Sequence, residues 1–264
     1  MKEIYFSHIP KSAGRSLTFI IEEESEKKLN STIFIGERYF YEHTIRVHKY
    51  YYSYYLKNKY LKKFIKFNDN SYKYNKSKTH WNIQFWHIPL SFWKNNLLMD
   101  LKKEKLIFLV VRNPYSKIIS VFKFWIKFYL KHKTGNFRIQ YKNLLKLVEN
   151  IYENNFDLTP KNMNYIIQKL LSSKKYEYAL DGHLIPQYKY IYTVINKKLI
   201  KIPDEILRFE NLEEDFKKFK NKYLKFIPNN ALKKTHLNPT QDRNLNVDEY
   251  TLTSKTRNLI YNYY

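Results

Sequence analysis

Cysteine is absent from the sequence, which excludes disulfide bonds, thiolate metal sites and cysteine nucleophiles. Glycine is scarce, with four in 264 residues against an average usage of about 7%. Long apolar runs are missing as well: no run approaches the length of about 20 residues that a membrane-spanning helix needs, and the N-terminus lacks the apolar segment of a secretory signal. We therefore expect a cytoplasmic protein with no membrane span.

Acidic residues are also few: 24 Asp and Glu face 48 Lys and Arg, which gives a formal net charge of +24. Such an excess favours an anionic partner, namely a nucleic acid, an anionic membrane, an acidic polysaccharide or a phosphorylated cofactor. The accompanying abundance of Lys, Asn, Ile, Tyr and Phe is typical of A/T-rich coding sequences, so the charge alone does not select a partner. A hydrophobic content of 44% argues against a disordered chain.

Hydrophobic periodicity predicts short strands alternating with amphipathic helices, which is the pattern of an α/β protein with a parallel sheet. The continuous apolar run at 106–111 is typical of a strand that is buried on both faces. Further strands are expected at 4–8, 32–35, 83–88 and 206–209, helices at 16–27, 92–99, 114–129, 141–152, 160–171, 211–223 and from about 251, and a loop at 181–188. Because no repeat or flexible linker interrupts the chain, we expect one domain over 1–264, with a basic, Tyr- and Lys-rich insertion around 43–80.

The most informative segment is 5–17, YFSHIPKSAGRSL, which indicates a strand, a tight turn and the start of a helix. Such a turn aims backbone N–H groups and the positive end of the helix at one point, so it predicts an anion site. Gly14 lies within it, and cations and hydroxyls crowd it: Lys11, Ser12, Arg15 and Ser16. The alternative is an ordinary strand-to-helix turn with a capping serine. The pattern is not a Walker A loop, because the lysine precedes the only glycine.

Two motifs carry a resemblance to a known family. Residues 8–17, HIPKSAGRSL, resemble the 5′-phosphosulfate loop of sulfotransferases that use 3′-phosphoadenosine 5′-phosphosulfate (PAPS), which usually reads HIPKTGGTS. Residues 111–120, VRNPYSKIIS, are similar to the family's 3′-phosphate motif, VRNPyxRlvS, and Arg112 and Ser120 keep its spacing of eight. The chain departs from the first motif at Ser12, Ala13 and Arg15, where the family commonly has Thr, Gly and Thr.

Weaker similarities extend the resemblance over most of the chain. Residues 181–187, DGHLIPQ, are similar to a family segment H-x-x-P-Q, and 206–216, ILRFENLEEDF, to a segment RFEnLeeDf. The branch that fits best is that of carbohydrate sulfotransferases like the uronyl 2-O-sulfotransferases. The resemblance implies a P-loop-like three-layer α/β fold, PAPS as donor, no metal, and transfer of a sulfuryl group to a hydroxyl of a carbohydrate.

The resemblance also implies residue roles. Lys11 would assist the leaving group, and the loop would bind the phosphosulfate through Lys11, Ser12, Ala13, Gly14, Arg15 and Ser16. Arg112 and Ser120 would hold the 3′-phosphate. His87 is our candidate for the catalytic base, because FWHIP at 85–89 is similar to the family's G-H-x-P segment; the alternative is a histidine packed among aromatic residues.

Candidates for the acceptor side are His43, His48 and His183. The insertion at 43–80 fits either a surface that binds an anionic acceptor or a solvated loop. Two other functions stay open: a basic protein that binds single-stranded nucleic acid through interleaved tyrosines, and a nucleotide-dependent kinase. If the sulfotransferase prediction holds, no nucleic-acid partner is expected.

Overall fold

The computed structural model describes residues 3–29, 34–35, 65–68, 71–76, 79–83, 87, 89, 91, 99, 102–103, 105–131, 159–173, 177, 182–234 and 249–264. Several predictions fall outside the described residues: His43, His48, the helix at 141–152, all of the helix at 92–99 but one residue, and much of the insertion at 43–80.

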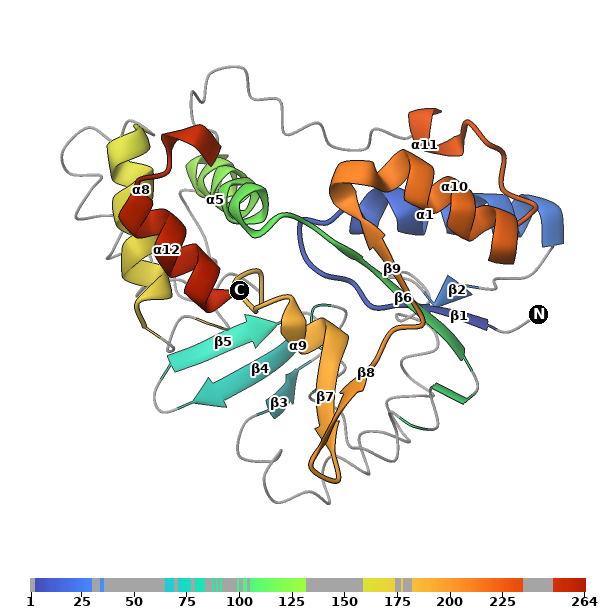
Figure 1. Ribbon diagram of the computed structural model, residues 1–264, viewed down its shortest axis with the longest axis horizontal. Coiled ribbons are helices and arrows are strands. Elements are labelled where there is room, and N and C mark those ends of the chain that lie inside the picture. The colour runs from blue at the N-terminus through green and yellow to red at the C-terminus, as the bar shows by residue number, and fades with distance from the viewer. Residues whose placement is uncertain are drawn as a thin grey trace.

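A four-stranded parallel sheet with strand order β2-β1-β6-β9 forms the centre of the fold (Figure 1). Its strands are β1 (Glu3–Phe6), β2 (Phe34–Ile35), β6 (Lys105–Val111) and β9 (Glu205–Arg208). Every residue from Leu106 to Val110 is at most 8% exposed. The sequence prediction of a doubly buried strand is therefore confirmed, and it follows from the helices on both faces.

The side chains of β6 alternate between two hydrophobic layers. Phe108 and Val110 pack with α1 (Gly14–Leu29) and α10 (Leu212–Tyr223), whereas Leu109 packs with α5 (Pro114–Lys131). Two more helices, α8 (Pro160–Leu171) and α12 (Ser254–Tyr263), lie beside α5, and a short α11 (Ala231–Lys234) lies by α1 (Figure 1). The expected small parallel sheet flanked by helices is present.

The two helices that follow neighbouring strands leave on opposite faces. β1 and β6 pair in parallel, with Ile4 opposite Leu106, yet α1 after β1 and α5 after β6 belong to different layers. The loops at the carboxyl ends of these two strands therefore diverge. Ligands of open α/β sheets bind at such a switch point, and both sequence motifs lie here.

Two antiparallel sheets are separate from the parallel sheet. One is the three-stranded sheet of β3 (Ile65–Asn68), β4 (Ser71–Lys76) and β5 (Thr79–Ile83), and the other is the hairpin of β7 (Tyr192–Ile195) and β8 (Lys198–Lys201). The strand predicted at 83–88 is wrong at His87, which lies in a short helical turn, and β5 ends at Ile83; residues 84–86 and 88 lie outside the described residues. Since Ile83 pairs with Tyr72 near the start of β4, little of that strand remains for a longer β5 to pair with.

Candidate functional site

The loop between β1 and α1 carries an unusual backbone. Ser7 N–H still donates to the Phe108 carbonyl at 2.9 Å, so the loop leaves the sheet directly after β1. Lys11 and Ala13 then take φ values of 67° and 58°, a left-handed conformation that residues with a Cβ seldom adopt. Turns of this kind gather backbone N–H groups around a concavity that suits an anion, and the N-terminus of α1 adds its own unbonded N–H groups.

Gly14 is required by packing rather than by its own backbone angle. A Cβ at this position would lie 2.6 Å from Cε1 of His8 and closer still to two other ring atoms. The His8 ring is held there because it stacks on Phe6, with centroids 5.6 Å apart, and meets His87 edge-on at 5.1 Å. The first histidine of the motif therefore closes over the start of α1.

The loop lies along one face of α5. The Arg112 guanidinium donates to the Lys11 carbonyl at 3.0 Å and to Ser116 Oγ at 3.1 Å. Two turns further along α5, Lys11 Nζ lies 4.4 Å from the centre of the Phe124 ring. Residues four apart share a helix face, so Ser120, between Ser116 and Phe124, faces the loop that carries Lys11.

Two serine hydroxyls at this site are buried without a hydrogen-bond partner among the described residues. Ser12 is fully buried and Ser120 is 4% exposed, and neither Oγ has a partner. Each belongs to one of the two phosphate motifs. A buried hydroxyl without a partner costs about 1–3 kcal/mol, so both hydroxyls are candidates for contact with a polar ligand.

Histidines from three distant segments meet beside the loop. His87 lies between His8 and His183, with ring centroids 5.1 and 5.0 Å away. His183 also stacks on Phe124, the ring that Lys11 contacts. The candidate base His87 and the candidate acceptor-side His183 are thus brought together next to the candidate catalytic lysine. Both are 6% exposed, so the unliganded site leaves their rings nearly covered.

The segment Gly182–Ile191 makes hydrogen bonds with Arg112, His87 and Lys117. Gln187 binds the backbone of Arg112, Tyr190 binds that of His87, and Lys117 binds the segment itself. The sequence analysis did not assign these three residues, nor Ser116 and Phe124. The one available signal was the H-x-x-P-Q similarity, which covers Gln187 but gives it no role.

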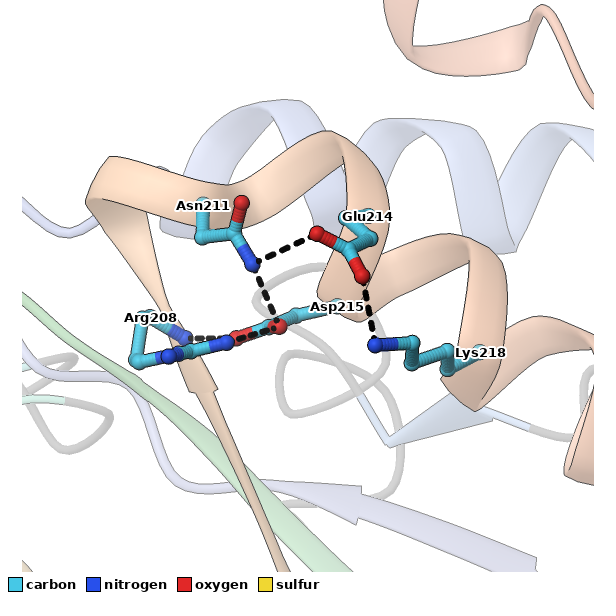
Figure 2. Close-up of polar contacts among 5 residues, drawn as sticks. All are labelled: Arg208, Asn211, Glu214, Asp215 and Lys218. Atoms are coloured by element: carbon cyan, nitrogen blue, oxygen red, sulfur yellow. Dashed lines mark hydrogen bonds and ion pairs between the residues drawn. The ribbon is translucent and has the colours of Figure 1, made fainter.

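The residues that directly follow β9 contact Arg112 and the start of α5. The Phe209 ring lies 4.1 Å from Arg112 Cζ, and a Glu210 carboxylate oxygen accepts from Asn113 N–H at 2.7 Å, at the start of α5. Asp215 fixes this corner: it accepts from Arg208 N–H and twice from the Arg208 guanidinium (Figure 2). The hydrogen bonds from Arg208 hold the pKa of the Asp215 carboxyl well below its usual range.

Asn211 and Lys218 complete the network of Figure 2 through Glu214, to which they donate at 3.2 and 2.5 Å. The hydrogen bonds within residues 208–215 therefore hold Phe209 in place against Arg112. The side chain of Arg15 lies outside the described residues, although its backbone is part of α1.

Within the described part of the chain, no group of three His, Asp or Glu side chains is arranged to hold a metal ion. In the same part, no helix has the length and apolar character needed to cross a bilayer.

The fold defines the chain as an α/β protein, and its candidate site, which carries Lys11, Arg112 and two buried serine hydroxyls, lies at the carboxyl edge of the parallel sheet. Comparison with known proteins takes the description no further: no family model, curated protein or solved structure matches the chain.

Proposed function

We propose that this protein is a PAPS-dependent sulfotransferase, with a P-loop-like arrangement of β1, its loop and α1, and that it transfers a sulfuryl group to a hydroxyl of a carbohydrate. The positive-φ loop, Lys11 and the Arg112–Ser120 pair support an anionic nucleotide as donor. The carbohydrate acceptor comes from the resemblance of the two motifs to carbohydrate sulfotransferases.

The chemistry assigns a task to each group. The bond between sulfur and the donor's phosphate oxygen breaks as the acceptor oxygen bonds to sulfur, and the acceptor's proton passes to His87. Charge develops on the departing phosphate oxygen, where Lys11 and the loop N–H groups stabilise it. One such preorganised donor is worth about 10²–10³ in rate, and a positioned base adds about 10²–10⁴.

The observation that carries the proposal is the pair of buried, unpartnered hydroxyls. Ser12 belongs to the phosphosulfate loop and Ser120 to the 3′-phosphate motif. Each serine belongs to one of the two motifs, so a donor with a 5′-phosphosulfate and a 3′-phosphate offers an acceptor to each hydroxyl. This match supports PAPS as the donor, whereas ATP lacks a 3′-phosphate.

The first experiment separates binding from stability. In Ser12→Ala and Ser120→Ala, the unliganded protein should keep its stability or gain up to about 1–3 kcal/mol, since a buried unsatisfied hydroxyl disappears. The affinity for 3′,5′-adenosine bisphosphate, measured by calorimetry without magnesium, should fall. Ser172→Ala is the matched control, because Ser172 Oγ donates to Gln168 O at the end of α8; it should lose stability and keep affinity.

A second experiment tests the reaction. Lys11→Ala should abolish sulfuryl transfer from PAPS to a panel of glycans while its melting temperature stays close to that of the wild type; Lys198→Ala, on the exposed hairpin, should stay active. Full activity in Lys11→Ala would refute the assignment. Stabilisation by magnesium and ATP but not by the bisphosphate would instead identify a nucleotide kinase.

A further inference from the structure

The segment Gly182–Ile191 forms a turn that is fixed before any ligand binds. Gly182 has a φ of 75°, and its carbonyl accepts from Ile185 N–H at 3.0 Å. The buried Lys117 amino group, from α5, donates to the carbonyls of both His183 and Ile185 at 3.2 Å. We call this segment the 182–191 turn.

One arm of the turn holds the backbone of Arg112. The Arg112 N–H donates to Gln187 Oε1 at 2.9 Å, and Gln187 Nε2 donates back to the Arg112 carbonyl at 2.6 Å. The Gln187 amide thereby bonds both backbone groups of a residue that has just left β6, in place of a neighbouring strand. Gln187 is 8% exposed, so water does not readily replace these bonds.

The other arm holds the histidine. The Tyr190 hydroxyl, fully buried, donates to the His87 carbonyl at 2.6 Å. Tyr190 lies three positions after Gln187, and its N–H donates to the Gln187 carbonyl at 2.9 Å. The short helix α9 (Tyr188–Ile191) thus links Gln187, which bonds to the Arg112 backbone, to Tyr190, which bonds to the His87 carbonyl.

We propose that Gln187 and Tyr190 are positioning residues, which set Arg112 on the donor side and the candidate base His87 from one rigid segment. This inference rests on the proposed function. In-line transfer needs the donor's phosphates and the acceptor's base in fixed relation, and a misplacement of about 1 Å can cost about 10²-fold in rate. Placing both supports on one turn meets that requirement with residues that touch neither substrate.

The two arms predict effects on different parameters, one on donor affinity and the other on kcat. Gln187→Met keeps the chain length and removes both bonds to Arg112, so its dissociation constant for 3′,5′-adenosine bisphosphate should rise by about tenfold or more. Tyr190→Phe removes one hydroxyl, so its kcat should fall by about tenfold or more, with bisphosphate affinity within about twofold of the wild type.

Matched controls exist on α8. Gln168 donates one part-buried hydrogen bond to Thr256 of α12, and Tyr165 has an exposed ring. Gln168→Met should lower the melting temperature, and neither it nor Tyr165→Phe should change affinity or kcat. Circular dichroism verifies that all four variants fold.

The outcomes separate the two claims. A wild-type protein that neither binds the bisphosphate nor uses PAPS overturns the proposed function. A wild type that does both, with Gln187→Met and Tyr190→Phe unchanged or with both variants altering the same parameter, overturns the positioning role alone. Weaker bisphosphate binding in Gln187→Met together with a lower kcat in Tyr190→Phe supports the positioning role.

Discussion

Replacing Gly14 by alanine should destabilise the protein through one specific collision. The added Cβ would lie 2.6 Å from His8 Cε1, so the imidazole has to leave its place. It would lose its contacts with Phe6 and His87, and aromatic pairs are worth about 0.5–1.5 kcal/mol each. Removing a glycine stabilises by about 0.4–1 kcal/mol through the unfolded chain. Together the two contacts lose about 1–3 kcal/mol, so after the gain of about 0.4–1 the net loss in free energy of unfolding should centre on about 1.3 kcal/mol.

A double-mutant cycle with His8→Ala makes the test specific. In the His8→Ala background the collision is gone, so Gly14→Ala should be neutral or stabilise by about 0.4–1 kcal/mol. Urea unfolding followed by circular dichroism gives the four free energies, and the coupling between the two positions should be about 1–3 kcal/mol.

Equal destabilisation by Gly14→Ala in both backgrounds would refute this reasoning, as would a wild-type background that tolerates alanine without loss. Either result would mean that the His8 ring does not occupy the start of α1 in solution.

Three further predictions concern charge. Burial lowers the pKa of Lys117 to about 7, so between about pH 7 and pH 10 the unfolded chain binds more protons at this group than the folded chain. Over that range the free energy of unfolding of the wild type should rise with pH relative to that of Lys117→Met. Arg208 depresses the pKa of Asp215, so the advantage of the wild type over Asp215→Asn should be present above about pH 4 and be lost as the pH falls below it, measured by unfolding across that range. Raising salt from about 50 to 200 mM should weaken bisphosphate binding by about tenfold at most in calorimetry, whereas binding of single-stranded RNA over a broad basic surface would lose about 10³–10⁵.

The sequence predicted those helices and strands that depend on neighbouring residues, such as a helix cap or a continuous apolar run. Thr159 caps α8 by accepting from Asn162 N–H, Pro160 opens it, and the observed bounds match the predicted ones. The run at 106–111 likewise became β6, extended by one residue. The hairpin β7–β8 was missed because its turn, Asn196–Lys197, uses two positive-φ residues without a glycine.

The contacts that build the site join segments that are far apart in the sequence. Gln187 and Arg112 are 75 positions apart, and Tyr190 and His87 are 103 apart. Hydrophobic periodicity carries no information about such pairs. The scarcity of glycine identified Gly14 correctly, but the physical reason is different from that of a strained turn: the positive φ angles belong to Lys11 and Ala13, and Gly14 makes room for His8.

The net charge of +24 is a poor guide to the site, because what matters is how each cation is held. Arg208 meets the carboxylate of Asp215, which cancels its charge (Figure 2). Lys11 and Arg112 lie over the rings of Phe124 and Phe209, and an aromatic face holds a cation while leaving its charge in place. The same two cations belong to the loops that diverge at the switch point and flank the unpartnered Ser12 and Ser120. These aromatic contacts hold both side chains beside the positions that we propose for an anionic ligand.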